Sequence, residues 1–315
     1  WQSVSEFLNQ IAKKGLSVNF ATLAGYSNIR RSLTRMAWRD LTEKEIKTAM
    51  ALITAAIQDG AVGCSVNLND FQIRKIPKFE IAELIKIIAK TRSVLALRLS
   101  DRSENAAADL EEIIALAQEH KVNLEINRFQ PLKNEAVESQ KIRKIIEAAG
   151  LNHQINFDCA LAETAVLEPR FFLPPPFNQS DRRTILNSLA EKEWLEKIAK
   201  NFRNFDAEKI TIRRAPTPLT FLNNQSLKTF SKNHGLTAVQ GFVKLLKMTN
   251  GDIGFFYRNI DQKILRETAL SPYSLIAAGD ARNSSADFFE IASAANWPIE
   301  KTIAKLTGQP ARKYR

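Results

Sequence analysis

The sequence predicts an α/β fold with a buried parallel sheet, arranged as a TIM-type (β/α) barrel. Apolar strand-like runs alternate with amphipathic helical runs, and at least five such units follow one another. Strands that are apolar over most of their length are typical of parallel sheets covered on both faces. This number of units favours a barrel over an open doubly wound sheet. No glycine-rich loop follows the first strand, which argues against a dinucleotide-binding version of the open sheet.

The first half of the chain supplies most of these units. The helical run 3–14 opens with Ser3 and Glu6 in a capping-box pattern, and the run 41–60 begins at Thr42 and stops at Gly60. The other runs are predicted strands at 16–25, 61–68, 94–99, 122–126 and 153–161, and predicted helices at 78–91, 103–120 and 134–150.

The alternation breaks at 168–181, where three successive prolines, Pro174 to Pro176, predict an extended segment. Later elements are a long helix around 181–203, strands at 209–214 and 273–278, and helices at 225–233, 236–249, 260–269, 285–295 and 298–308. We therefore divide the chain into three parts. Residues 1–167 form barrel strands and helices, 168–250 an elaborated insertion with its own helices, and 251–315 the C-terminal part of the barrel.

Composition narrows the class of protein. The 315 residues are 44% hydrophobic, enough for a sizeable core. The net charge of +11 would suit an anionic partner, but basic and acidic residues are interleaved along 111–121 and 189–200, as on solvated helix faces. Nucleic acid is therefore the least favoured partner. No run of about 18 apolar residues predicts a membrane span.

Two cysteines far apart in the chain form no disulfide framework and indicate a reducing, cytoplasmic compartment. Both lie in apolar strand-like runs, so we expect Cys64 and Cys159 to be small buried side chains. The chain starts at Trp1 inside a helical run, from which we expect further sequence upstream.

Candidate functional residues lie where the predicted strands end, because reactive groups of such barrels come from the carboxyl ends of the strands. They are Asn67, Arg98, Ser100, Arg128, Asp158 and Asp280. Ordinary structural roles stay open for each: an arginine in a surface salt bridge, or an aspartate in a cap or turn. The three histidines, His120, His153 and His234, lack metal-ligand spacing and do not end apolar strands.

Four segments, in order, resemble the N-acyl-D-amino-acid deacylases (D-aminoacylases) of the amidohydrolase superfamily. The most specific is IEKTIAKLTGQPARKY (299–314), which is similar to a family helix followed by a K-M/L-T-x-x-P-A turn. The others are the segments 1–30, 41–68 and 155–177, which resemble V-N-x-x-x-L-x-G-H-x-x-L-R, G-A-x-G-x-S-T-G-L and D-x-Y-P-Y…L-P-P-W. Together they span nearly the whole chain.

The resemblance implies a metal-dependent hydrolase barrel, incomplete here at both ends, that holds one or two zinc ions. In the family, zinc-bound water attacks an N-acyl amide, a C–N bond outside peptides, while an aspartate carries the proton. The matching positions place Asp280 at the catalytic aspartate. Arg98 and Arg128 stand at two metal-binding histidines, and Ser100 stands at the family's arginine. Tyr26 stands at the histidine of G-H, and Asn67 at the glycine of T-G-L.

An arginine has no lone pair to offer and keeps its positive charge, so it cannot ligate zinc. We therefore expect a catalytically degenerate protein, a pseudoenzyme, with no metal cofactor in this chain. We hypothesise that Arg98 and Arg128 replace the missing cation and pair with Asp280 and Asp158. The alternatives are an active hydrolase with an altered metal site, and an anion-, carboxylate- or nucleic-acid-binding protein. A small anionic or acylated amino-acid ligand would suit the arginines.

Overall fold

The computed structural model describes residues 3–68, 76–99, 106–150, 154–278 and 284–314. The chain divides into two compact units. Unit 1 comprises Trp1–Gln130, Val137–Leu161 and Lys263–Arg315, and unit 2 comprises Pro131–Ala136 and Ala162–Gln262. The three-part division at 168 and 250 expected from the sequence stays a prediction.

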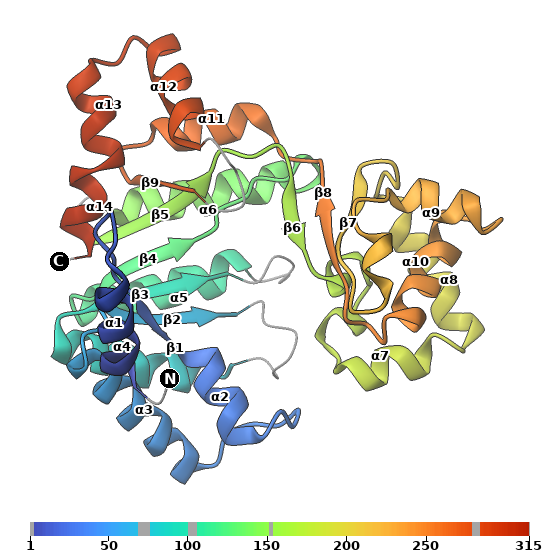
Figure 1. Ribbon diagram of the computed structural model, residues 1–315, viewed down its shortest axis with the longest axis horizontal. Coiled ribbons are helices and arrows are strands. Elements are labelled where there is room, and N and C mark those ends of the chain that lie inside the picture. Colours follow the sequence, from blue (N-terminus) through green and yellow to red (C-terminus); the bar gives the residue numbers. More distant parts are fainter. Residues whose placement is uncertain (1–2, 69–75, 100–105, 151–153, 279–283, 315) are drawn as a thin grey trace. The chain divides into compact units, whose positions relative to one another are not determined.

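Unit 1 is built on a six-stranded sheet with the strand order β1-β2-β3-β4-β5-β9, in which every neighbouring pair is parallel (Figure 1). The strands are β1 (Leu23–Gly25), β2 (Gly63–Asn67), β3 (Val94–Arg98), β4 (Asn123–Asn127), β5 (Ile155–Ala160) and β9 (Ser274–Ala277). Consecutive strands from β1 to β5 are neighbours and each is joined to the next through a helix, as the predicted strand–helix alternation requires.

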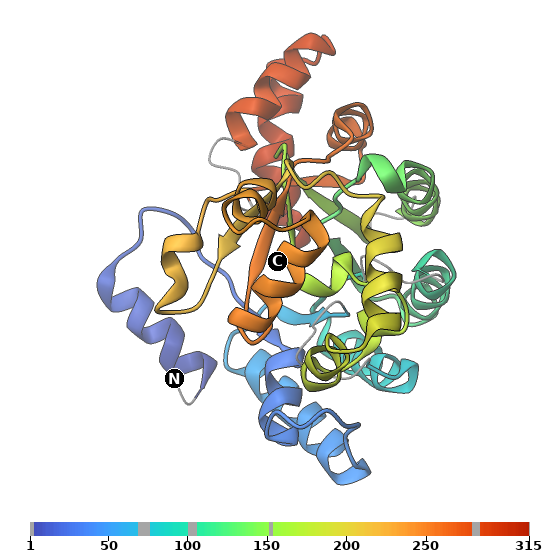
Figure 2. The same ribbon diagram turned by 90° about the vertical axis from the view of Figure 1, so that its right-hand side faces the viewer.

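The α-helices of unit 1 connect its strands or flank its sheet, and α3 to α6 follow one another around the outside, from blue to green in Figure 2. They are α1 (Val4–Lys14), α2 (Tyr26–Thr34), α3 (Glu43–Gln58), α4 (Lys78–Thr91), α5 (Ala106–Glu119), α6 (Ala136–Ala149), α11 (Gln262–Leu270), α12 (Ser284–Ala294), α13 (Ile299–Leu306) and α14 (Gly308–Lys313). A short 3-10 helix, η1 (Lys133–Glu135), precedes α6. Thr42 and Glu45 form a capping box at the start of α3, which confirms the predicted start of this helix at Thr42.

One face of the sheet carries the core of unit 1. Strand residues two apart point to the same face, and parallel partners share it. Cys64, Leu95, Leu124 and Ile155 are thereby aligned across β2 to β5, and each is at most 2% exposed. Burying an aliphatic side chain of this kind contributes about 1.5–3 kcal/mol, so this row fixes the sheet against its helices. The opposite face carries polar residues.

Unit 2 has an antiparallel sheet in the order β6-β8-β7 and a core of aromatic rings. Phe172 lies at its centre, with ring centroids 5.1 Å from Phe205, 5.5 Å from Phe255 and 5.7 Å from Phe242. Its strands are β6 (Ala165–Leu167), β7 (Ile210–Arg214) and β8 (Gly254–Tyr257). Its helices are α7 (Arg182–Ser188), α8 (Lys192–Phe202), α9 (Leu227–Asn233), α10 (Ala238–Met248) and the 3-10 turns η3 (Pro169–Phe172), η4 (Phe177–Gln179) and η5 (Leu219–Leu222).

Several elements differ from their predictions. The strand expected over 16–25 is only Leu23–Gly25, because pairing with β2 begins at Leu23. The proline-rich segment forms turns around Pro175 and Pro176 and short 3-10 helices rather than one extended stretch. The helix expected at 181–203 is two helices, because the turn after α7 brings Leu189 into the core.

Helix α2 and strands β6 and β8 escaped sequence reasoning for physical reasons. Helix α2 begins at Gly25, which has no side chain to cap it, so no start signal is visible in the sequence. Strands β6 and β8 are three and four residues long, too short to show an alternating pattern.

Cys64 and Cys159 are free and fully buried, as predicted, and burial raises the pKa of each thiol to about 12. Within the described ranges, no helix combines the length and the apolar character that crossing a bilayer requires.

We expect Gly63→Ala to destabilise the chain by more than about 3 kcal/mol, because a Cβ atom there would lie 2.0 Å from the backbone oxygen of Val94. Urea unfolding followed by circular dichroism measures the effect. Gly308→Ala is the control, because no atom lies within 4 Å of the added methyl group. Equal unfolding midpoints for the two variants would contradict this close approach of β2 and β3.

Candidate functional site

A row of polar residues lies at the carboxyl ends of the central strands of unit 1. Asn67 pairs with Arg98, and Arg98 pairs with Asn127 in the next strand. The ladder between β4 and β5 runs up to Ile126 and Phe157, so Asp158 follows at the level of Asn127. Because parallel partners share a face, these four side chains leave the sheet on the same side. In parallel barrels, the active-site residues lie at the carboxyl ends of the strands.

Asp158 is held by the backbone of the chain that leaves β4. The amide of Arg128 donates to Asp158 Oδ1 at 2.8 Å, and the amide of Phe129 donates to the Asp158 carbonyl oxygen at 2.9 Å. Arg128 adopts φ of 58°, in the left-handed region that non-glycine residues seldom occupy. This turn aims the backbone amide at the carboxyl group and leaves the Arg128 side chain exposed.

Glu125 lies two residues before Asn127 on the same face and forms a carboxyl pair with Asp158. Glu125 is 2% exposed, and the Tyr314 hydroxyl donates to its Oε2 atom. Burial raises the pKa of Asp158 to about 7, and the charge of Glu125 and a hydrogen bond with it act in the same direction. A carboxyl group that is poorly solvated and lies beside a second carboxyl group favours its protonated form at a higher pH than usual.

The C-terminal helix α14 supports this pair from the amino end of β4. Lys313 is 6% exposed, and its ammonium group donates to the carbonyl oxygens of Leu124 at 2.7 Å and Gln154 at 3.2 Å. Burial lowers the pKa of Lys313 to about 8, and the nearby Glu125 opposes that change. Lys313 and Tyr314 therefore join the end of the chain to β4 and to the start of β5.

A second buried polar cluster follows β1. The Tyr26 hydroxyl donates to Glu80 Oε2 at 2.5 Å, and the Arg30 guanidinium donates to both Glu80 oxygens at 3.2 and 3.3 Å. All three residues are 0% exposed. Burial and the Glu80 carboxylate raise the pKa of Tyr26 far above its usual range. Tyr26 stands where the resemblance places a histidine, and here it serves a three-residue ion-pair network.

The structure brings Asn67, Arg98 and Asp158 into one row and places Arg128 one residue beyond it. Their functional roles stay predictions. Ser100 and Asp280 lie outside the described residues, and so does the hypothesised pairing of the two arginines with Asp280. The recorded contact of Arg128 with Asp158 is made by its backbone amide.

Sequence reasoning missed Glu125, Asn127 and Tyr314. A signal for the first two is present: Asn123, Glu125 and Asn127 alternate with apolar residues in a strand that is otherwise buried, which marks a polar face. No local signal marks Tyr314, because its partner Glu125 lies 189 residues away in the chain.

The described strand ends do not fit a zinc ion. Zinc takes three or four thiolate, imidazole or carboxylate ligands, whereas this row and its neighbour Glu125 offer two amides, a guanidinium and only two carboxyl groups. Among the residues that the structure describes, no three His, Cys, Asp or Glu side chains gather into a group that could hold a metal ion.

Comparison with known proteins identifies relatives among the deacylases. A D-aminoacylase of Alcaligenes xylosoxydans xylosoxydans is 23% identical over 159 residues, which are 50% of this chain and 33% of that enzyme. No family model matches the chain.

Two solved structures share the fold. A D-aminoacylase studied for its binuclear metal center superposes with a TM-score of 0.76 at 18% identity, covering 100% of this chain and 61% of that one. The second is an N-acyl-D-glutamate deacylase from Bordetella bronchiseptica, complexed with zinc and a phosphonate inhibitor. It superposes with a TM-score of 0.75 at 15% identity, covering 100% of this chain and 62% of that one. This chain thus spans less than two thirds of each relative.

These likenesses confirm the predicted resemblance to D-aminoacylases and the predicted fold class of an amidohydrolase-type α/β barrel. The parallel sheet β1 to β5 with β9 is the part of that fold that carries the polar row.

We expect Asp158→Asn to stabilise the protein above neutral pH. Folding raises the pKa of Asp158, so the folded chain holds the proton of this carboxyl group more tightly than the unfolded chain does. The protonated carboxyl group therefore contributes fully to the free energy of unfolding near about pH 4, and this contribution is lost as the pH rises through about 7. Asparagine stays neutral, keeps an oxygen for the Arg128 amide and can donate to Glu125.

Relative to the wild type, the free energy of unfolding of Asp158→Asn should be higher by on the order of 1–3 kcal/mol at about pH 8 and nearly equal at about pH 4. Urea unfolding across this pH range measures it, with the exposed Glu290→Gln as control. If the free energy of unfolding varied with pH in the same way for the wild type and Asp158→Asn, the raised pKa of Asp158 would be refuted.

We expect Glu80→Gln to lower the free energy of unfolding by about 3–5 kcal/mol, because the buried Arg30 would lose its fully buried carboxylate partner and keep its 3.4 Å ion pair with the partly exposed Asp40. Glu83→Gln on the same helix is the matched control, since Glu83 forms only an exposed pair with Lys86. Thermal unfolding of both variants gives the comparison, and a loss below about 1 kcal/mol for Glu80→Gln would contradict the network's role.

Proposed function

We propose that this chain is a catalytically degenerate D-aminoacylase-like protein that binds a carboxylate-bearing ligand, of the acylated amino-acid class, at the carboxyl ends of β2 to β5. The observation that carries this proposal is the position of Arg98, in register with Asn67 on one side and Asn127 on the other. A cation therefore stands in the middle of the row of polar side chains.

The chemistry of this row suits a carboxylate. A guanidinium group keeps its charge at all physiological pH values and presents paired N–H groups that match the two oxygens of a carboxylate. Asn127 Oδ1 is buried without a hydrogen-bond partner among the described residues. It could accept the N–H of an acylated amino acid whose carboxylate lies on Arg98. A buried acceptor without a partner costs about 1–3 kcal/mol, which such a ligand would recover.

Hydrolysis is not supported by the same residues. In the family the attacking water is activated by zinc, and Arg98 and Arg128 stand at the positions of two of its histidines. The raised pKa of Asp158, about 7, keeps this carboxyl group protonated below neutral pH, where it can donate a hydrogen bond.

Calorimetric titration of the zinc-free chain with N-acetyl-D-glutamate and N-acetyl-D-alanine tests this function. We expect binding without release of the free amino acid, and Arg98→Gln should weaken it about 10- to 100-fold by removing charge-assisted hydrogen bonds. Arg266→Gln, an exposed arginine on α11, is the control for net charge.

Zinc content and amine release after incubation with zinc complete the test. Near-stoichiometric zinc with release of the amino acid would identify a working hydrolase and overturn the degenerate-site proposal. Equal affinities of Arg98→Gln and Arg266→Gln would overturn the carboxylate site.

A further inference from the structure

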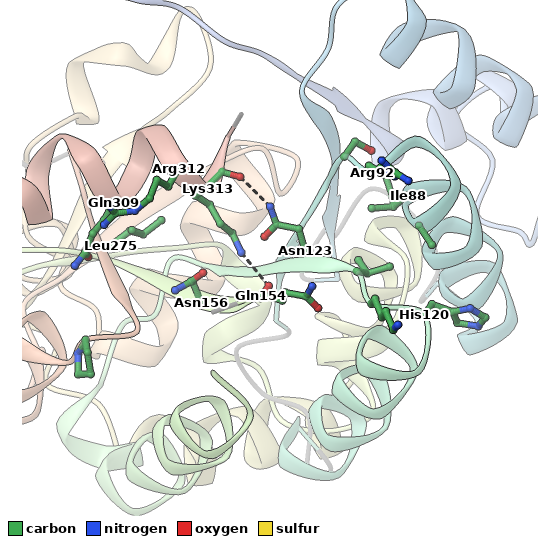
Figure 3. Close-up of a pocket in the computed structure, with 15 residues that line it drawn as sticks. Ile88, Arg92, His120, Asn123, Gln154, Asn156, Leu275, Gln309, Arg312 and Lys313 are labelled. Carbon is green, nitrogen blue, oxygen red and sulfur yellow. Dashed lines mark hydrogen bonds between the residues drawn. The ribbon is translucent and has the colours of Figure 1, made fainter. Parts of the chain in front are cut away.

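We propose that unit 1 has a second ligand site, a cavity at the amino ends of β3, β4 and β5 that binds an organic phosphate carrying hydroxyl or amine groups, such as a nucleotide. The cavity measures about 940 Å³, within the size range of small-molecule sites. Its residues come from the turns before these strands and from α14, as the sticks in Figure 3 show. The polar row lies at the other end of the same strands.

The lining of this cavity is cationic. Arg92, Lys121 and Arg312 line it, together with the buried Lys313, and no Asp or Glu is among its described lining residues. None of the first three forms an ion pair with a carboxylate in the described part of the chain. Lys313 is already committed to two carbonyl oxygens, so three side chains remain to meet a negative charge.

Two of these cations occupy positions that favour glycine. Arg92 ends α4 and Lys121 follows α5, and both have φ of 53°. Helices commonly end on a left-handed residue, usually glycine, because other side chains cost roughly 1–2 kcal/mol in this conformation. Each cation compensates the negative end of one helix, yet both helices end at the same cavity. Without these side chains the helix ends would repel an anion there.

Two acceptors in the lining point to the rest of the ligand. Asn123 Oδ1 and Gln309 Oε1 are buried without a hydrogen-bond partner among the described residues. The Asn123 amide nitrogen donates to the Lys313 carbonyl oxygen at 2.8 Å, which orients the side chain (Figure 3). A bare anion offers no donor to these oxygens, whereas a sugar hydroxyl or a base amine does. Ile88, Val122 and Leu275 supply an apolar wall for the organic part.

Titration with ATP in the absence of divalent metal tests the site. We expect saturable binding by the wild type and at least 10-fold weaker binding by the double variant Arg92→Gly/Lys121→Gly. Glycine relieves the left-handed backbone, so this variant should fold. Arg35→Gly is the matched control, because Arg35 ends α2 with the same left-handed geometry and does not line the cavity.

Unchanged ATP affinity in the double variant would overturn the site, as would an equal loss in Arg35→Gly. Loss of thermal stability in the double variant with unchanged ATP binding would assign the cations to helix capping alone and also overturn it.

Inorganic triphosphate and citrate separate a built site from diffuse attraction of anions. Gln309→Leu should weaken ATP binding at least 3-fold and leave triphosphate binding unchanged, because only ATP has a base amine and sugar hydroxyls that can donate to Gln309. Equal binding of ATP, triphosphate and citrate, unaffected by Gln309→Leu, would overturn recognition of an organic phosphate. The ATP, triphosphate and Gln309→Leu results do not depend on the carboxylate site, whose probe and variant are different. Citrate is itself a carboxylate, so it is titrated into Arg98→Gln, in which that site is weakened.

Discussion

The register between parallel strands β2, β3, β4 and β5 is the constraint on which the rest of unit 1 depends. It aligns the buried apolar residues on one face and thereby places Asn67, Arg98, Asn127 and Asp158 together on the other. A slip of one residue in any strand would exchange the two faces of that strand and bury polar groups against the helices. The burial of the apolar row therefore determines the geometry of the candidate site.

The same geometry accounts for the way the buried carboxyl groups of unit 1 are accommodated. A barrel interior with several acidic groups needs positive charge or protons to offset their repulsion. Here burial and the neighbouring Glu125 raise the pKa of Asp158, Tyr314 donates to Glu125, and the Lys313 ammonium group donates to the Leu124 carbonyl oxygen of the same strand. The protein's own hydrogen bonds thus satisfy the carboxyl pair without an ion between its oxygens. The Tyr26 hydroxyl and the Arg30 guanidinium likewise satisfy the buried carboxylate of Glu80.

The two ends of the parallel sheet carry different chemistry. The carboxyl ends combine one arginine with amides and a carboxyl group, while the amino ends combine several cations with amide oxygens and an apolar wall. Helix α14 contacts both, because Lys313 reaches β4 from below and Tyr314 reaches Glu125 in the middle of that strand. A ligand at the amino ends would therefore contact the element that orders the carboxyl pair.

The sequence by itself determined the order of strands and helices, the parallel sheet, the buried cysteines and the strand ends where polar residues occur, because these follow from local periodicity and capping. It also determined the resemblance to the deacylases through four colinear segments. Only the tertiary structure decided that Glu125 and Asp158 form a pair, that Tyr314 serves it and that Arg92 and Lys121 share a cavity. Those relations join residues up to 189 positions apart, and only packing determines such contacts. The tertiary structure also limits β1 to three residues, because a strand forms only where a neighbouring strand pairs with it.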